Sequence, residues 1–188
     1  MTDDSPREEM HKDPGARGVP GDPVAEAVVD RIKGAVAADS HGQTVVHVPR
    51  ESWVDAVRIL KEEQQFTQCS DLTAVDQLLR PDRPLPPGVE RERFEVVANF
   101  LSHPRNRRIR LITQVPDGDG CEVASLFELF PGTELPEREV YDLLGVRFAG
   151  HPDLVRLLLP DDWDGHPLRK DDPPARVPVQ FKEAQTPR

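Results

Sequence analysis

The sequence predicts an α+β fold: a mixed, mainly antiparallel sheet of about four strands with two helices on one face, followed by short helices and an extended C-terminal tail. Two stretches near the start have apolar residues at helical spacing, and two alternating stretches in the middle are joined by a short turn. The last third is rich in proline and charge. The order α-β-α-β-loop-β-β, followed by helices and a tail, is typical of this class.

The chain has 188 residues, enough for one domain with tails. Residues 1–21 combine charges, prolines and glycines with almost no large apolar side chain, so they are expected to be a disordered N-terminal tail. The α+β domain is placed at 22–133. Residues 134–172 form an extension expected to contact a partner, and 173–188 are a proline-rich tail.

Two helices are expected in the first third. Asp22 and Pro23 are a plausible N-cap and first helical residue, and the apolar spacing that follows predicts a helix of roughly fourteen residues over 22–36. After a break at 39–42, residues 43–48 read as a short strand. Pro49 opens a second helix, on which Trp53 belongs to an apolar stripe, so core packing is favoured over a role as a binding aromatic.

The middle of the chain predicts strands. Residues 66–75 read as one strand, a proline-rich connection follows, and 93–103 with 108–115 alternate as an antiparallel hairpin. Four arginines gather at the hairpin end, and they could form a phosphate site. A solvated turn beside an edge strand that is protected from aggregation is the favoured reading. These residues are Arg105, Arg107, Arg108 and Arg110.

The segment after the hairpin is expected to begin with a turn at 116–120 and a short apolar helix ending near Pro131. A second helix is predicted over 134–144, because proline and glutamates suit its first turn and Gly145 suits its end. Its apolar side would be buried, and Arg138 would face Asp142 one turn later. A strand is expected at 146–148.

Composition excludes several functions. A net charge of −10, with basic residues interleaved among more numerous acids, argues against nucleic-acid binding. No run approaches the roughly 18 apolar residues of a membrane helix, and the N-terminus has no signal-peptide pattern. The chain is therefore expected in the cytosol, with any membrane association coming through partners. Cys69 and Cys121 stand alone and are expected to be free, half-buried thiols.

No cofactor site is evident in the sequence. The cysteines are not grouped for an iron–sulfur cluster, no histidines are paired for zinc, and no glycine-rich phosphate loop follows a strand. A general acid/base hydrolase could use Glu137, Glu139 or Asp142 with His151. Glutamates at a helix N-terminus are stabilised there without any catalytic duty, however, so this alternative is the weaker one.

One segment carries a specific resemblance. Its matching positions are 137–146, Phe148, 150–154, Trp163 and 165–171, with weaker matches at 71–76 and 94–97. This pattern closely resembles the signature of the thirty-kilodalton subunit, known as C, of respiratory complex I. The chain departs from the family pattern at Leu135, at 99–100 and at Asp172, which concerns the packing of the helix start and the tail.

The resemblance implies a structural subunit in the peripheral arm of a proton-translocating NADH:quinone oxidoreductase, with no catalytic residue of its own. The main partner would be the subunit known as D, which helps form the quinone site, and the subunit known as B would lie nearby. The quinone would lie close without being bound by this chain alone, and FMN and iron–sulfur clusters would reside in other subunits. The assembly would lie on the cytoplasmic side of the cell membrane. The alternative is the equivalent subunit of a related complex with a deazaflavin, ferredoxin or hydrogenase-type donor.

The resemblance also suggests where the partner binds. Residues 166–172 have no helical or strand period, so they are expected to be mobile in the free chain and to become ordered against the main partner, with charges meeting opposite charges. The predicted contact residues are Glu137, Arg138, Glu139, Asp142, His151, Trp163, His166, Arg169, Lys170 and Asp171.

Overall fold

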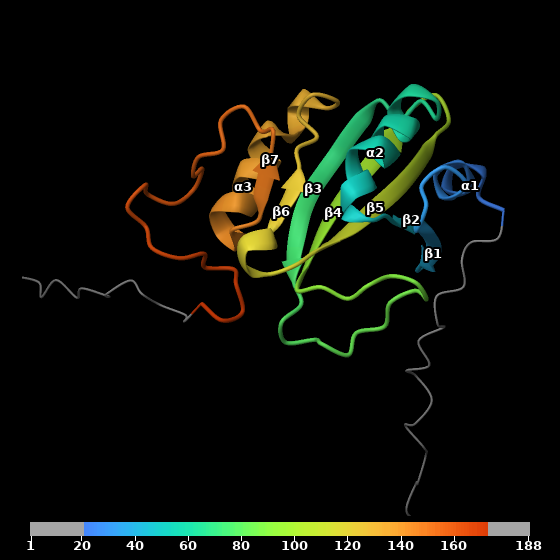
Figure 1. Ribbon diagram of the computed structural model, residues 1–188. Coiled ribbons are helices and arrows are strands. Elements are labelled where there is room, and N and C mark those ends of the chain that lie inside the picture. Colours follow the sequence, from blue (N-terminus) through green and yellow to red (C-terminus); the bar gives the residue numbers. More distant parts are fainter. Residues whose placement is uncertain (1–20, 173–188) are drawn as a thin grey trace, which may run out of the picture.

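The computed structural model describes residues 21–172, and its centre is a sheet of five strands in the order β1-β2-β5-β4-β3 (Figure 1). Strand β2 runs parallel to β5, and the other neighbours are antiparallel. The predicted mixed, mainly antiparallel sheet is therefore confirmed, with one strand more than expected. The strands are β1 (Val36–Ser40), β2 (Gln43–His47), β3 (Gln68–Asp76), β4 (Phe94–Ser102) and β5 (Arg107–Val115).

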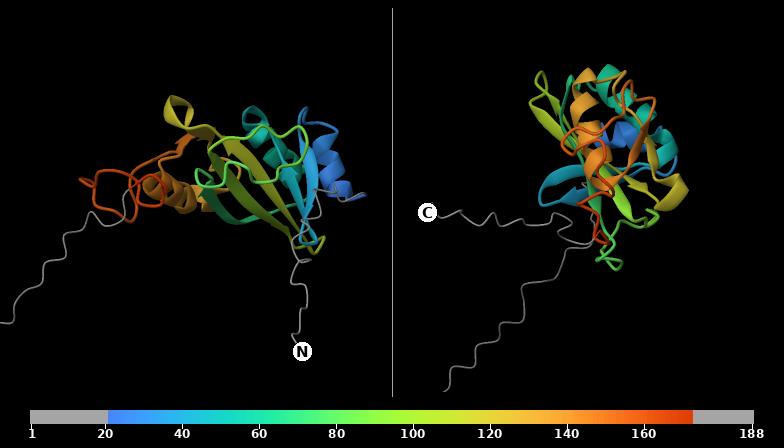
Figure 2. Two further views of the ribbon diagram at one scale, coloured as in Figure 1. Left: turned by 90° about the horizontal axis from the view of Figure 1, so that it is seen from below. Right: turned by 90° about the vertical axis from the view of Figure 1, so that its left-hand side faces the viewer.

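Two helices cover one face of this sheet, α1 (Pro23–Val29) and α2 (Trp53–Glu62), which follows a 3-10 turn at Arg50–Ser52 (Figures 1 and 2). The core lies between them and the sheet. Every second residue of β4 from Phe94 to Phe100 is fully buried, and so is Trp53 on α2. Trp53 is thus a core residue, as its spacing predicts.

The additional strand comes from residues expected to lie in the first helix and the break after it. Helix α1 begins as predicted, with the Asp22 carboxylate accepting from the backbone N–H groups of Val24 and Ala25, but it ends at Val29. The predicted helix over 22–36 is therefore too long. His41 and Gly42 both have positive φ, 54° and 79°, which suits a tight hairpin turn. That turn folds β1 back onto β2.

The chain after β5 forms a smaller unit beside the edge strand β3 (Figure 1). The short apolar helix expected before Pro131 is wrong, because residues there form a strand and a turn instead. Strand β6 pairs in parallel with β7, which follows helix α3. The elements are a 3-10 turn (Gly118–Gly120), β6 (Glu122–Ala124), a 3-10 turn (Pro131–Thr133), α3 (Glu134–Leu144) and β7 (Arg147–Ala149).

The place of β5, the two cysteines and the lengths of the helices each bear on an expectation from the sequence. Strand β5 is the central strand of the sheet, so the edge-strand explanation for its arginines is wrong. Cys69 and Cys121 are free; Cys69 is half-buried and Cys121 buried. No helix among the described residues is long and apolar enough to cross a membrane. Residues 1–20 of the predicted N-terminal tail, and the predicted tail 173–188, lie outside the described residues.

Candidate partner interface

Helix α3 organises the C-terminal part of the chain. It spans Glu134–Leu144 as predicted, and Gly145 ends it in the left-handed conformation, φ 73°, with its N–H donating to Tyr141 O. Val140 and Leu144 are buried on its inner side. Two acidic residues predicted to contact a partner, Glu137 and Asp142, are also fully buried. Their charges therefore serve this chain's own structure.

Glu137 holds the turn before α3. Its carboxylate accepts hydrogen bonds from the Ser125 hydroxyl at 2.6 Å, the Leu126 N–H at 2.7 Å and the Thr133 hydroxyl at 2.9 Å. Burial raises the pKa of the Glu137 carboxyl group, and these three hydrogen bonds oppose the rise. A side chain with no exposed surface and all its partners inside the chain is not available to a neighbouring protein.

Asp142 holds the loop that follows β7. Its Oδ2 accepts from the consecutive N–H groups of residues 157–159 at 2.7–3.0 Å, and its Oδ1 accepts from the Arg156 guanidinium at 2.7 Å. Burial alone would favour the neutral acid, but these hydrogen bonds lower the pKa of Asp142 to about 2. Arg156 also donates to the carbonyls of Trp163 and Gly165. The ion pair between Asp142 and Arg156 therefore holds this loop in place.

The predicted pairing of Arg138 with Asp142 is wrong. Arg138 instead donates to the carbonyls of Val155 and Arg156, at 3.1 and 2.9 Å. An arginine one turn before an aspartate on a helix competes poorly with a partner that reaches a buried carboxylate directly. Arg156 is that partner, and Arg138 closes the same loop from outside.

The segment predicted to be mobile, 166–172, lies on α3. Leu168 N–H donates to Leu143 O at 3.0 Å, and the Arg169 guanidinium donates to Leu144 O at 2.7 Å. The His166 ring nitrogen Nδ1 lies 2.9 Å from Asp142 O. These groups satisfy carbonyls at the C-terminal end of α3, which have no partner inside a helix. The segment therefore lies on its own domain in the described chain, and its mobility before assembly stays a prediction.

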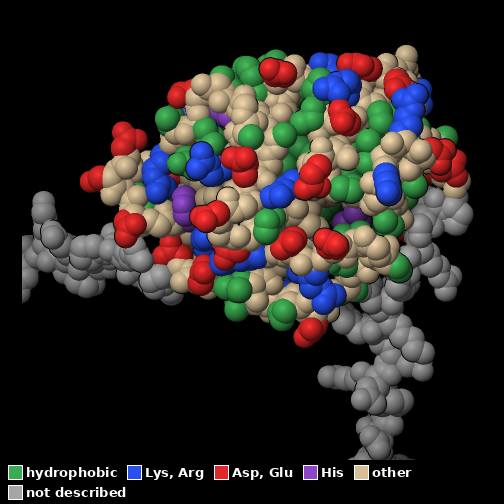
Figure 3. All heavy atoms as spheres, in the orientation of Figure 1, with side chains coloured by type: hydrophobic (Ala, Val, Ile, Leu, Met, Phe, Trp, Pro, Cys, Tyr) green, Lys and Arg blue, Asp and Glu red, His purple; other side chains and the backbone are tan. Residues whose placement is uncertain are grey.

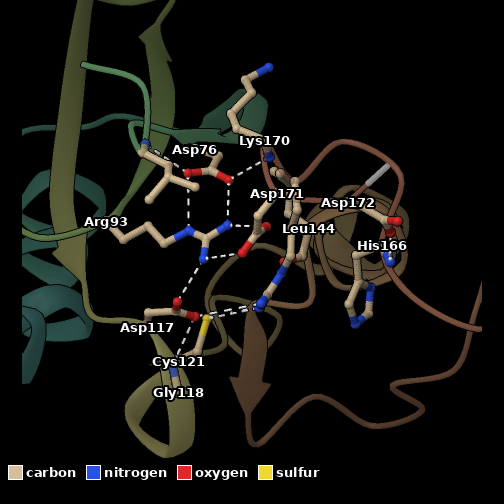
Figure 4. A network of polar contacts seen from close by, with 12 residues as sticks. Asp76, Arg93, Asp117, Gly118, Cys121, Leu144, His166, Lys170, Asp171 and Asp172 are labelled. Atoms are coloured by element: carbon tan, nitrogen blue, oxygen red, sulfur yellow. Dashed lines mark hydrogen bonds and ion pairs between the residues drawn. The ribbon is translucent and has the colours of Figure 1, made fainter. Parts of the chain in front are cut away.

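A polar network fastens the same segment to the main sheet (Figure 4). Arg93, the residue before β4, pairs with Asp76 at 2.8 Å, with Asp117 at 2.6 Å and with Asp171 at 2.5 Å. Asp76 also accepts the Lys170 N–H at 2.9 Å, and its side chain is fully buried. Arg93 thus connects β3, the turn after β5 and the C-terminal segment.

Stacking supports this network. The guanidinium carbons of Arg93 and Arg169 lie 4.9 and 5.1 Å from the centre of the Phe94 ring. The Arg169 guanidinium also reaches Asp117, at 3.5 Å. Arg169, predicted to meet a partner, is therefore engaged within the chain.

The remaining predicted contact residues divide by exposure. His151 is half-buried, with Nε2 lying 3.0 Å from Glu134 O, and Trp163 is half-buried beside the loop held by Arg156. Glu139 and Lys170 are exposed, and neither side chain has a polar partner among residues 21–172. In Figure 4 the Lys170 side chain points away from the network. Asp171 is exposed but paired with Arg93.

Sequence reasoning missed the residues that hold the segment in place, Arg93, Asp117 and Arg156, as well as the exposed apolar side chains beside α3. A single arginine inside the apolar run 155–159 was the available signal for Arg156.

Hydrophobic side chains on the face in Figure 3 lie scattered between charges of both signs. The exposed apolar residues of this segment are Leu135 (53% exposed), Val155 (45%), Leu158 (62%) and Leu168 (51%).

Glu137 and Asp142 serve the internal structure of this segment. No group of His, Cys, Asp or Glu within residues 21–172 is placed to hold a metal ion. Glu137 and Asp142, two of the acids of the hydrolase alternative, are enclosed and saturated with hydrogen bonds, so neither is open to a substrate. Residues 166–172 are packed on α3 and fastened to the main sheet.

Comparison with known proteins agrees with the signature in this segment. Residues 46–177 match the family described as respiratory-chain NADH dehydrogenase, 30 Kd subunit. The chain belongs to this family. A relative in Geobacter sulfurreducens, named as the C component of NADH-quinone oxidoreductase, is 46% identical over 74% of this chain and 82% of its own. The protein of the same name in Saccharopolyspora erythraea is 36% identical over 91% of this chain, which spans 61% of that longer protein.

Solved structures show the same family fold. A trypsin-resistant fragment (1–134) of Nqo5 superposes with a TM-score of 0.57 at 32% identity, covering 65% of this chain and 91% of the fragment. One chain of an archaeal membrane-bound sulfane sulfur reductase superposes with a TM-score of 0.66 over 86% of this chain and 95% of its own. At 21% identity, that second similarity concerns the fold alone.

The packing of residues 166–169 on the C-terminal end of α3 gives one prediction. A Cβ atom at Gly145 would lie 2.7 Å from the His166 ring, and φ is 73°. We expect Gly145→Ala to lower the free energy of unfolding by about 1–2 kcal/mol from the left-handed backbone alone, and by more because His166 must move. Urea denaturation measures the loss.

The matched control is Gly132→Ala, where an added Cβ meets nothing within 4 Å and φ is not in the left-handed region. Equal denaturation midpoints for the two variants would contradict the packing of residues 166–169 on the end of α3.

Proposed function

We propose that this chain is a non-redox structural subunit in the peripheral arm of a proton-translocating NADH:quinone oxidoreductase. It packs near the quinone site against the subunit known as D, the quinone-site partner, with the subunit known as B nearby. It supports electron transfer from NADH to quinone without binding either one alone. FMN and iron–sulfur clusters reside in other subunits, and the isolated chain is inactive. The assembly lies on the cytoplasmic side of the membrane.

The observation that carries this proposal is a pair of exposed leucines beside the C-terminal half of α3, Leu158 and Leu168, which we call the apolar border. Leu158 and Leu168 leave more than half of their surface open, although the backbone around them is held by Asp142 and by Leu143. A leucine fixed outward on an ordered backbone loses little entropy when it is buried by a partner. This border lies within the segment whose residues match the family.

Fewer charged residues are available to a partner than the sequence predicts. Glu139 and Lys170 are the predicted contact residues that combine exposure with a free charge within the described chain. Arg169, Glu137 and Asp142 act indirectly, because they hold the backbone that presents the border. Charges at the rim of an interface chiefly set association rate and partner choice, so the leucines are expected to supply more of the affinity.

The test is capture of the quinone-site partner from the same organism by the tagged full chain. We expect Leu158→Asp to weaken capture at least about tenfold, because burying a leucine contributes roughly 1.5–3 kcal/mol. Lys170→Glu should slow association with a smaller loss of affinity. The melting temperature of both free variants should stay within about 2 °C of the wild type, since surface substitutions change stability by no more than about 0.5 kcal/mol.

The matched control is Leu79→Asp, because Leu79 is 73% exposed but lies in the connection after β3, outside the C-terminal segment. Capture by that variant should equal the wild type. Undiminished capture by Leu158→Asp would place the contact elsewhere and refute this interface.

A further inference from the structure

A second surface lies on the face of the sheet that α1 and α2 leave uncovered. It is a groove of about 580 Å³ at the end of the sheet where β2, β3 and β5 begin and β4 ends. No residue of the C-terminal segment lines it. The groove is therefore separate from the proposed contact with the quinone-site partner, and its function is a separate question.

The alternation of β5 decides which side chains enter the groove. Ile109 and Leu111 are buried on the helix side, 3% and 0% exposed, so Arg108 and Arg110 lie on the opposite face. Since β5 is the central strand, both arginines have two strands on either side and lie away from the sheet edges. A charged pair at that position has no role in protecting a sheet edge.

Neither of these arginines is neutralised by an acid. Arg110 donates to the amide oxygens of Asn99 and Gln43, at 3.1 and 3.0 Å, and both partners are uncharged. The Arg108 side chain has no polar partner in the part of the chain that the structure describes. Arg107, at the rim, differs because it pairs with Asp22 at 2.5 Å. Two guanidinium charges without an acidic partner among residues 21–172 therefore face the groove, in a chain of net charge −10.

The opposite wall carries an acid, Asp71, on β3. Strand β3 is two positions from β5 in the sheet, a backbone spacing of about 10 Å. Within residues 21–172 Asp71 forms no ion pair with either arginine, and water and salt screen the remaining attraction. The groove is thus positive along β5 and negative along β3.

We propose that this groove binds an extended acidic peptide segment of a partner protein. Arg108 and Arg110 are two residues apart on one strand, a spacing of about 7 Å. Alternate side chains of any extended peptide have the same spacing, so two carboxylates at positions i and i+2 can meet both arginines at once. Guanidinium groups pair with carboxylates through two parallel hydrogen bonds. A single small anion engages one arginine and leaves the other unused.

The test uses a fluorescein-labelled peptide with alternating threonine and glutamate, and a second peptide of the same composition with its glutamates adjacent. Fluorescence anisotropy with the full-length chain at low salt should show the alternating peptide binding at least about fivefold tighter. Affinity should fall as salt rises, because the contacts are exposed ion pairs.

Arg108→Gln should weaken binding of the alternating peptide about tenfold, which equals about 1.4 kcal/mol. The Arg108 side chain has no polar partner in the described chain, so this variant should melt like the wild type. Arg110→Gln should weaken binding similarly. The matched control is Arg58→Gln on α2, an exposed arginine paired with Asp55, and its affinity for the peptide should not change.

Three results would overturn the proposal. The first is equal binding of the two peptides, and the second is unchanged affinity in Arg108→Gln. The third is displacement of the peptide by inorganic phosphate at an equal concentration, because that would indicate a site for a single anion. The loss of partner capture by Leu158→Asp is unaffected by any of these outcomes, so the two proposals fail separately.

Discussion

Asp142→Ala should lower the free energy of unfolding by about 3–5 kcal/mol, the usual cost of leaving a buried charge without its partner. The substitution removes the acceptor of Arg156, whose side chain is 17% exposed, and of three consecutive N–H groups at 157–159. Amide exchange of residues 157–159 should rise with it. The loop around Arg156 would then open, and Leu158 would lose the fixed position on which the contact with the quinone-site partner depends.

The loss should depend on pH in a defined direction. The pKa of Asp142 is about 2 in the folded chain and 3.8 in its unperturbed state. A lowered folded pKa stabilises the fold above the unfolded value, and this contribution disappears as pH falls from about 4 towards 2. The difference between wild type and Asp142→Ala should therefore shrink by about 2 kcal/mol over that window.

The control is Asp162→Ala, an exposed aspartate in the same part of the chain with no polar partner among residues 21–172. Its free energy of unfolding should change by less than about 0.5 kcal/mol. A similar small change in Asp142→Ala, or a difference that does not vary between pH 4 and 2, would contradict the assigned role of the carboxylate.

Arg93→Ala should have the next largest effect, again about 3–5 kcal/mol. Its removal leaves the fully buried carboxylate of Asp76 without an ion-pair partner and frees Asp171. Burial opposes ionisation of Asp76, but the hydrogen bonds from Arg93 and from backbone N–H groups keep the pKa of that carboxyl group below its usual value. Without Arg93, the burial cost is no longer balanced.

The measurement is urea denaturation together with amide exchange of Lys170, whose N–H donates to Asp76. Exchange at Lys170 should become faster in Arg93→Ala as the segment leaves the sheet. Arg80→Ala is the control, because Arg80 is exposed and its side chain has no partner within the described residues. If the two arginine variants are equally stable, the network in Figure 4 does not fasten the segment.

Elements with local signals could be predicted from the amino-acid sequence. Pro136 lies in the first turn of α3 and Gly145 ends it, the alternation of 94–102 and 107–115 defines the hairpin, and the stripe through Trp53 defines α2. Each of these signals depends on neighbours within one or two turns. The family signature is local as well, because it is a run of side chains in fixed order. Fold class and family could therefore be read before any tertiary contact was known.

Which charges face outward depends on contacts between residues that are apart in the sequence. Glu137 and Asp142 look like surface acids on a helix, yet Ser125 and Arg156, distant in sequence, close over them. Residues 166–172 lack a period because only part of their backbone bonds within the segment, while the N–H groups of Leu168 and Lys170 donate to α3 and to Asp76. Strand β1 forms because its hairpin turn returns it to β2. Which ion pairs form and which strands pair depends on how distant parts of the chain come together. Local residue spacing does not encode this.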